Sequence, residues 1–329
     1  MNDEKCLNEG VDIVKNIYYI CAQVLQILVN CATIVFIIST RKYLLQYRVH
    51  NSVKVIFCAL CGCICLHCVV FVAFQVQHLL TALTARNPCD VFQSPLYCVV
   101  IRFIIRSACN YFVLLQLGFC IDRTTATVFA KTYEVSRVYL GALICILAAI
   151  FSLAAAALTD WSSENNEPLI SCLNNNKDNW IAVDIWNYVF MATNISTFIW
   201  VCVIFLINRK MHRRWDRNLS CRYQIQENLD SSRLIIILGF IQFAFFSIYI
   251  TSNIVRRAFV ESIEPVKYRT LAGLLYMVSY YCFVTPVVMV GFICKQRRNK
   301  LTTLQQKLGQ SSKGTAGQNA YFGAYQRQW

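Results

Sequence analysis

Residues Tyr97–Arg123 read YCVVIRFIIRSACNYFVLLQLGFCIDR, an apolar run that ends in an acid and a base, Asp122-Arg123. A helix needs about 20 mostly apolar residues to cross roughly 30 Å of hydrocarbon, so this run can span a membrane. The chain contains seven such runs at even spacing: Ile17–Ser39, Val55–Gln77, Tyr97–Ile121, Val138–Thr159, Ile181–Ile207, Leu234–Val255 and Leu271–Ile293. They predict an all-α fold, a single bundle of seven transmembrane helices.

The composition supports a membrane protein. Hydrophobic residues make up 57% of the 329 residues, and the mean hydropathy is +0.46. The expected organisation is an N-terminal segment over 1–16, the bundle over 17–294 and a tail over 295–329. We expect no signal peptide, because the first apolar run follows a polar stretch and is long enough to remain as a helix. We also expect no enzyme, because no convincing catalytic arrangement of acids, Ser or His occurs at depth.

The positive charges lie mainly on one side of the predicted bundle. Of the 31 Lys and Arg residues, 21 fall in the loops after the first, third and fifth runs and in the tail, and 8 fall on the opposite side. Cytoplasmic loops carry the excess of Lys and Arg, so the N-terminus is expected outside and the C-terminus inside. The net charge of +14 is then explained by topology and by anionic membrane lipids, and we expect no nucleic-acid partner.

Two arginines within the third run point to a ligand site. Arg102, Arg106 and Asn110 are spaced four residues apart and share one helix face. Because an arginine at mid-membrane costs roughly 2.5–3.5 kcal/mol, this face is expected to turn inward, where it could meet an acidic or hydrogen-bonding ligand. The alternatives are a structural pair with Asp184 of the fifth run, or extension of both side chains to the outer headgroups. Other residues that could line the same cavity, or serve only as anchors and packing groups, are Trp186, Asn187, Tyr276, Ser279 and Tyr280.

The chain has 18 cysteines, most of them within the apolar runs. In the second run, Cys58, Cys61, Cys65 and Cys68 repeat along one helical face, where thiols act as small packing residues. His67 could add a metal ligand beside them, but packing is the favoured interpretation, so we expect no metal and no cofactor. Four cysteines lie at or beyond the outer boundary, where an oxidising space permits disulfides: Cys6, Cys89, Cys98 and Cys172.

The seventh run and the tail contain further signals. Pro286 lies within the apolar run and is expected to kink that helix. Leucines repeat at helical spacing among basic residues after this run, which predicts a short amphipathic helix on the membrane surface over about 295–308, ended by Gly309. Cys294, at its start, could carry a lipid or remain a free thiol.

The third run resembles the third helix of G-protein-coupled receptors. Cys98 and Arg123 are 25 residues apart, roughly 37 Å of helix, which places them at opposite ends of one tilted span. In that architecture a cysteine on top of helix three is tied to the second outer loop, and an acid–arginine pair closes the same helix at the cytoplasm. The resemblance implies a disulfide between Cys98 and Cys172, with Cys6–Cys89 as a second pair, although Cys89–Cys172 is an open alternative.

Two motifs narrow the resemblance. Asp122–Thr127 reads DRTTAT and is followed by Lys131–Glu134, KTYE, while Leu219–Asn228 reads LSCRYQIQEN. Both are similar to motifs of the Sra superfamily of nematode serpentine chemoreceptors, and the likeness covers essentially the whole chain. Serpentine receptor class alpha is the first choice and the related alpha-beta class the second. The residues that the resemblance associates with switching and G-protein coupling are Asp122, Arg123, Arg222, Tyr223, Glu227 and Asn228.

The resemblance implies a chemosensory function such as olfaction. The expected protein binds a small extracellular ligand and signals through a heterotrimeric G protein from the plasma membrane of sensory neurons or their cilia. A seven-helix ligand-gated channel, with its N-terminus inside, or a transporter is the alternative. The sixth run lacks the Trp and Pro of rhodopsin-like receptors, and the seventh lacks their Asn-Pro-x-x-Tyr motif, so the activation machinery of that class cannot be transferred in detail.

Overall fold

The fold is an all-helical bundle, seen here in a computed structural model that describes residues 12–46, 49–85, 87–129, 139–161, 169–172, 180–214, 219–259, 262–311 and 323. Seven stretches of the described residues are long and apolar enough to cross a membrane. The prediction of a seven-helix transmembrane bundle is therefore confirmed. The orientation of its ends relative to the membrane stays a prediction.

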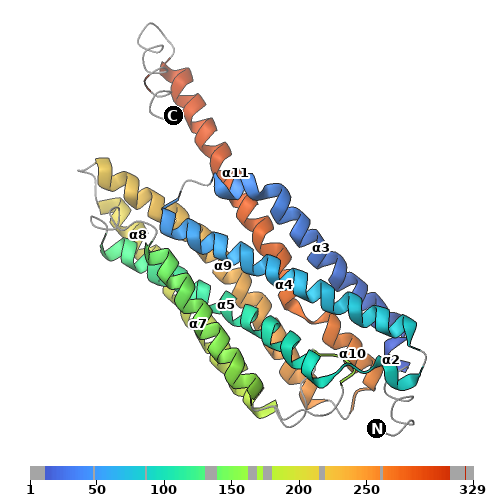
Figure 1. Ribbon diagram of the computed structural model, residues 1–329. Helices are drawn as coiled ribbons and strands as arrows, with labels where there is room; N and C mark the ends of the chain where they lie inside the picture. The colour runs from blue at the N-terminus through green and yellow to red at the C-terminus, as the bar shows by residue number, and fades with distance from the viewer. Residues whose placement is uncertain are drawn as a thin grey trace.

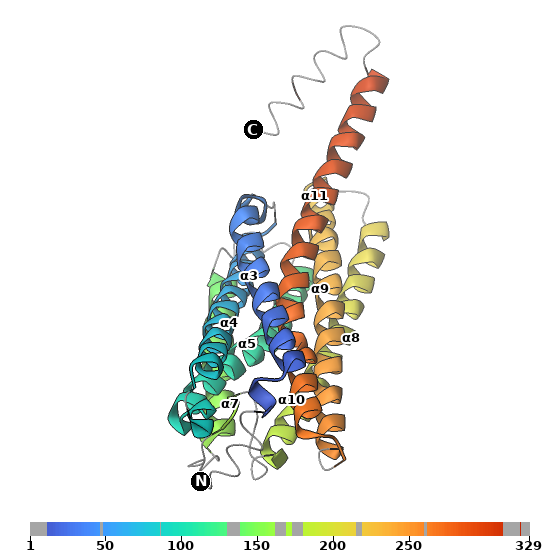
Figure 2. The ribbon, with the colours of Figure 1, turned by 90° about the vertical axis from the view of Figure 1, so that its right-hand side faces the viewer.

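The long helices run side by side (Figures 1 and 2). In chain order they are α3 (Ile17–Leu45), α4 (Asn51–Thr84), α5 (Pro95–Val128), α7 (Tyr139–Trp161), α8 (Trp180–Arg214), α9 (Leu219–Ala258), α10 (Pro265–Leu274) and α11 (Met277–Ser311). The short α2 (Asp12–Val14) and the 3-10 turn η2 (Pro88–Val91) lie at the same end of the bundle as α10. We call this the α10 end, and the opposite end, where α5 finishes, the Arg123 end.

Local sequence explains where several helices begin. Asn16 precedes α3, and its side-chain oxygen accepts a hydrogen bond from the backbone N–H of Tyr18 at 3.0 Å. Ser94 caps α5 in the same way, and Pro95 follows at the first helical position, where a missing N–H costs nothing. Pro265 begins α10 similarly. These caps supply acceptors for N–H groups that have no partner within the helix.

The apolar side chains divide between the core and the lipid-facing surface. Helix α5 occupies the middle, in contact with α4, α7, α8 and α9, and its Phe112, Leu115 and Phe119 are fully buried. Large apolar residues such as Leu28 and Leu158 are exposed on the outside of the bundle. In lipid this exposure carries no penalty, because hydrocarbon tails solvate apolar side chains as well as another helix does.

Glycine permits the closest approach between two helices. A methyl group added at Gly141 of α7 would overlap the backbone of Ser52 in α4. The hydroxyl of Ser52 in turn donates to Asp122 of α5 at 2.5 Å. The small residue thus brings three helices together at the Arg123 end, as expected where polar groups meet inside a membrane bundle.

The last predicted span differs from the expectation in two ways. It is divided into α10 and α11, with Leu275 and Tyr276 between them, and the carbonyl of Gly273 accepts from the Gln26 side chain at 3.0 Å and from the backbone N–H of Tyr276 at 3.3 Å. The predicted surface helix over 295–308 is not a separate element, because α11 continues without interruption to Ser311 and projects beyond the bundle (Figure 2). Pro286 lies inside α11, and the kink expected there stays a prediction.

Candidate functional site

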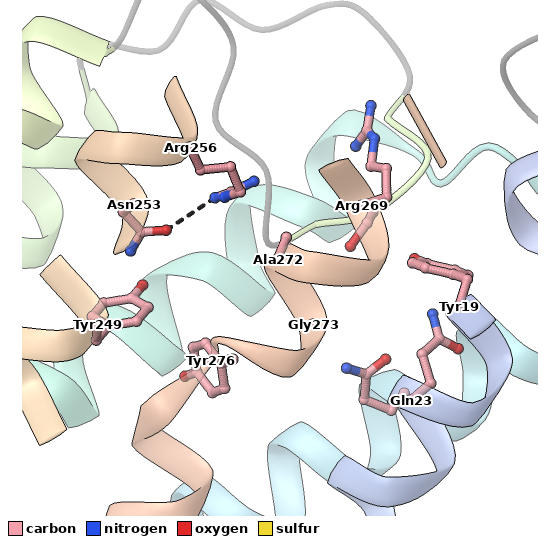
Figure 3. Close-up of a pocket in the computed structure, with 11 residues that line it drawn as sticks. Tyr19, Gln23, Tyr249, Asn253, Arg256, Arg269, Ala272, Gly273 and Tyr276 are labelled. Atoms are coloured by element: carbon pink, nitrogen blue, oxygen red, sulfur yellow. Dashed lines mark hydrogen bonds between the residues drawn. The ribbon is translucent and has the colours of Figure 1, made fainter. Parts of the chain in front are cut away.

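A cavity opens at the α10 end of the bundle. The space within it, open solvent at its mouth included, is about 550 Å³. It is bounded by α3, α9, α10 and Tyr276, the residue directly before α11 (Figure 3). Tyr side chains, amides and two arginines dominate its wall. The lining residues are Tyr19, Gln23, Gln75, Ser171, Tyr249, Asn253, Arg256, Arg269, Ala272, Gly273 and Tyr276.

The charge of the cavity wall is positive. Arg256 and Arg269 both line it, and no Asp or Glu occurs among the lining residues that the structure describes. Arg256 is held in place, since its Nη2 donates to Asn253 Oδ1 at 2.9 Å and its guanidinium lies 4.5 Å from the ring centre of Tyr268. Its Nη1 is buried and has no hydrogen-bond partner within the described part of the chain. A donor of this kind could bind an anionic or carbonyl group of a ligand.

Tyr276 forms the floor of the cavity at the break between α10 and α11. It is 5% exposed, and its ring stacks on Phe71 of α4 with 4.8 Å between centroids. Its hydroxyl lies 2.9 Å from Nε2 of His67, one layer deeper in the bundle. The floor residue therefore contacts both the cavity and the core beneath it.

The other predicted ligand residues do not line this cavity. Asn110 is buried and donates to the carbonyl of Ser152 in α7 at 3.3 Å, and Arg102 is buried on the same face of α5. Asp184 forms an ion pair with Arg257, and the alternative pairing of Arg102 or Arg106 with Asp184 stays a prediction. The ligand role of five residues outside the cavity wall stays a prediction: Arg102, Arg106, Asn110, Asn187 and Tyr280. Asp184, the remaining predicted ligand residue, lies half-buried in its ion pair, also away from the cavity wall.

Sequence reasoning missed Arg256 and Arg269 as cavity residues. Both were counted as loop charges on the outer side, but they lie within α9 and α10. The available signal was Pro265, which starts a new helix just before Arg269. Such a helix directs Arg269 and the small residues Ala272 and Gly273 toward one place, and the cavity lies there.

A disulfide holds part of the cavity roof. Cys98, at the beginning of α5, is bonded to Cys172, with 4.6 Å between their Cα atoms, which is the pairing that the resemblance implied. The neighbouring backbone of Leu169 pairs with Gln93, and Ser171 lines the cavity. Cys89 is also disulfide-bonded, but its expected partner, Cys6, lies outside the described residues. The Cys98 bridge thus fixes the segment over 169–172 above the cavity.

A second polar site lies at the Arg123 end. Asp122 and Arg123 are both almost fully buried, and Asp122 Oδ2 accepts from Arg123 Nη2 at 2.6 Å and from Nε at 3.1 Å. The second oxygen of Asp122 accepts from Ser52 of α4. The remaining Arg123 nitrogen, Nη1, donates to α9, at 3.0 Å to Asn228 Oδ1 and 2.7 Å to Ser231 Oγ. One buried ion pair therefore joins α4, α5 and α9.

The predicted coupling residues divide between this network and its surroundings. Asn228 also donates to the carbonyl of Ala126 at 3.3 Å, so it contacts α5 at two points. Glu227 is exposed. Arg222 and Tyr223 lie in α9, but their side chains are outside the described residues. The sequence block over 219–228 and the pair at 122–123 are thus brought together through Asn228.

Comparison with known proteins places this geometry in a family. The family described as "Serpentine type 7TM GPCR receptor class ab chemoreceptor" matches residues 16–329. The chain belongs to this family. The recognition of a nematode serpentine chemoreceptor is thereby confirmed, and the matching class is the second of the two expected. As a serpentine receptor of class ab, the chain is a multi-pass membrane protein of a chemoreceptor family.

Relatives of this class ab receptor come from two named classes. The chain is similar to serpentine receptor class beta-17 of Caenorhabditis elegans, with 25% identity over 85% of this chain and 78% of the relative. It is 22% identical to class beta-18 over 95% of this chain and 86% of the relative, and 23% identical to class alpha-11 over 75% and 76%. Both of these are also from Caenorhabditis elegans. All three are named as receptors, which agrees with a non-enzymatic function.

Proposed function

We propose that this class ab receptor binds a small extracellular ligand in the cavity at the α10 end and signals to a heterotrimeric G protein at the Arg123 end. The observation that carries the proposal is the separation of two polar sites at opposite ends of one apolar bundle. One is an open cavity lined by hydrogen-bonding groups. The other is a closed, buried network that joins three helices.

The chemistry of the cavity favours a ligand with a negative or strongly hydrogen-bond-accepting group. Arg256 and Arg269 both line the space, and Nη1 of Arg256 has no hydrogen-bond partner in the described part of the chain. The tyrosines Tyr19, Tyr249 and Tyr276 supply flat apolar surface beside them. A small carboxylate with an apolar body fits this combination.

The Arg123 end supplies the element that a switch requires. An ion pair that is buried while α5 and α9 are together would become accessible if α9 moved outward, because Asn228 and Ser231, which accept from Arg123 Nη1, both belong to α9. A ligand can shift such an equilibrium only by binding the two arrangements with different affinity. Helices α9 and α10, which carry Arg256 and Arg269, form the cavity wall. A ligand in the cavity would therefore contact α9, the same helix that carries Asn228 and Ser231 at the Arg123 end.

The orientation belongs to the same proposal. The excess of Lys and Arg around the Arg123 end favours its placement in the cytoplasm, with the cavity and disulfide outside. The plasma membrane of sensory neurons or their cilia is the site of action that the receptor class favours. An epitope at Met1 should stain on intact cells. Staining only after permeabilisation would reverse the orientation and favour a channel.

The ligand site is tested by screening small carboxylates on cells that express the full chain, with a calcium readout. For an active compound, Arg256→Gln should raise the effective concentration roughly 10- to 150-fold, because a hydrogen bond to a charged group contributes about 1.5–3 kcal/mol. Lys267→Gln is the matched control, since it removes one positive charge from a side chain that is 77% exposed and pairs with Glu264 of the same helix end. Equal responses of the two variants, at equal surface expression, would place the ligand elsewhere.

A further inference from the structure

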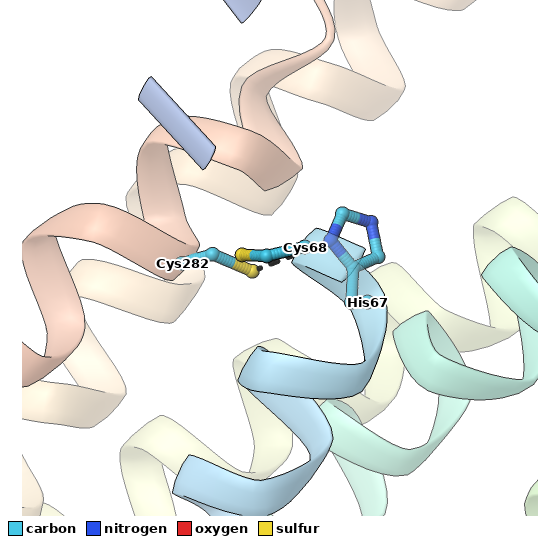
Figure 4. A group of neighbouring side chains, drawn as sticks. All are labelled: His67, Cys68 and Cys282. Carbon is cyan, nitrogen blue, oxygen red and sulfur yellow. Dashed lines mark hydrogen bonds between the residues drawn. The ribbon is translucent and has the colours of Figure 1, made fainter. Parts of the chain in front are cut away.

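Three side chains that can bind a metal meet in the core beneath the cavity. His67 and Cys68 come from α4 and Cys282 comes from α11 (Figure 4). Their ligand atoms all lie within 4.8 Å of one another, and His67 Nδ1 is 3.7 Å from Cys282 Sγ. All three residues are fully buried. His67 and Cys68 are adjacent in the chain, and the bundle adds Cys282 from a helix more than 200 residues away.

We propose that His67, Cys68 and Cys282 form a binding site for monovalent copper, which goes beyond the receptor function proposed above. Metal–sulfur and metal–nitrogen bonds of about 2.3 and 2.0 Å around one ion put neighbouring ligand atoms roughly 3.5–4 Å apart. The 3.7 Å separation of His67 Nδ1 and Cys282 Sγ already has this value. Contraction of the cluster by less than about 1 Å would complete the coordination.

The orientation of the histidine supports metal binding. Metal-bound histidines usually donate the other ring N–H to a neighbouring acceptor, which fixes the ring. Here Nε2 lies 2.9 Å from the hydroxyl of Tyr276, so Nδ1 is directed to the two sulfur atoms. The ring also packs against the neighbouring rings of Phe71 and Tyr276, with centroid distances of 5.7 and 6.0 Å. The imidazole is therefore positioned before any ion arrives.

The number and type of ligands favour Cu(I) over Zn(II). Thiolate ligands are soft and select Cu(I) as well as zinc, but structural zinc sites take four protein ligands. The cluster has three, and no fourth His, Cys, Asp or Glu joins it among the described residues. Cu(I) bound to the imidazole and to both sulfur atoms needs both thiols as thiolates, so two thiol protons are released as the ion binds.

The position of the cluster gives the ion a role in the receptor. The site links α4 to α11 just below Tyr276, and Tyr276 is the cavity floor. A bound ion would tie these two helices together and fix the floor residue through His67. Occupancy would therefore alter how the cavity closes on a ligand.

The experiment titrates the purified full chain with Cu(I) alone, under reducing conditions and against bicinchoninate as competitor. The wild-type protein should retain one equivalent, with a copper X-ray absorption spectrum of two sulfur neighbours and one nitrogen neighbour. His67→Ala, Cys68→Ser and Cys282→Ser should each lose this equivalent. Cys63→Ser, which removes a buried thiol of α4 outside the cluster, should keep it. Tyr276→Phe should bind about 10- to 100-fold more weakly, because it removes the acceptor of the histidine N–H.

Different results would contradict the existence of the site, the identity of its ligands and the choice of ion. A wild-type protein that yields all its copper to bicinchoninate would overturn the site without any reliance on the folding of variants. Copper retained equally by Cys68→Ser and Cys282→Ser would place it on other cysteines. Tight Zn(II) binding without Cu(I) binding would overturn the choice of ion. None of these measurements depends on the ligand or on a G protein, so the receptor proposal stands or falls separately.

Discussion

Replacement of Asn228 by alanine should open the Arg123 end and raise signalling in the absence of ligand. The substitution removes the acceptor that lies 3.0 Å from Arg123 Nη1, and it also removes the donor to the carbonyl of Ala126. The ion pair with Asp122 and the hydrogen bond to Ser231 remain. Asn228→Ala therefore weakens the contact between α5 and α9 without leaving a buried charge unpaired.

The size of the effect follows from the bonds that are lost. A hydrogen bond to a charged group contributes about 1.5–3 kcal/mol, and the lower value applies here because Asn228 is only half-buried. Each 1.4 kcal/mol changes an equilibrium about tenfold. If the open arrangement is populated at about 1% in the wild-type receptor, the variant should reach roughly 10%. Basal signalling should rise by a similar factor.

The assay is ligand-free nucleotide exchange on the G protein, or the second messenger it controls, divided by the amount of receptor at the surface. Gln226→Ala is the matched control, because Gln226 lies on the same helix and its amide donates only to Asp230, also of α9, at 3.1 Å. It should leave basal signalling unchanged. Basal activity of Asn228→Ala that equals that of Gln226→Ala, with normal expression of both, would refute the view that this network holds α9 closed.

Two further substitutions test other contacts that hold the bundle together. Replacement of both Cys98 and Cys172 by serine should lower the free energy of unfolding by up to about 4 kcal/mol, since the bridge closes a sequence separation of 74 residues. An unchanged melting temperature in detergent would contradict this. Gly141→Ala should destabilise the protein by about 1–3 kcal/mol, because its methyl group would overlap the backbone of Ser52, whereas Gly62→Ala has free space around it and should be neutral in the same melting measurement.

The spans could be predicted because the membrane imposes a simple length and composition rule. Lipid admits helices of about 20 apolar residues, and the seven runs satisfied it without knowledge of packing. The Arg123 end was also accessible, since Asp122-Arg123 and the block that ends at Asn228 are each recognisable in sequence. What the sequence did not supply was their contact, because nothing local brings position 123 to position 228.

The cavity was harder to predict for a physical reason. Arg256 and Arg269 lie at the ends of apolar runs, where arginines usually extend to lipid headgroups or water. Only the turn of α9 into α10 places both beside one space, and that turn is set by tertiary packing. The break at Tyr276 could not be predicted either, because no proline interrupts the run there. The side chain of Gln26, from α3, supports the break by donating to the carbonyl of Gly273. A metal site was not expected because the cysteines of the second run repeat along one helical face, which favours packing, and nothing in the sequence links them to Cys282.

Helix α11 continues without interruption past the end of its apolar run and projects beyond the bundle. From Ile293, where the apolar run ends, to Ser311 the helix continues for 18 residues, about 27 Å at 1.5 Å per residue. A tilt of roughly 10° within the bundle would swing the far end by about 5 Å. Movements too small to resolve between packed helices would thus appear as displacements at the tail, and a fluorophore attached there would report them at long range.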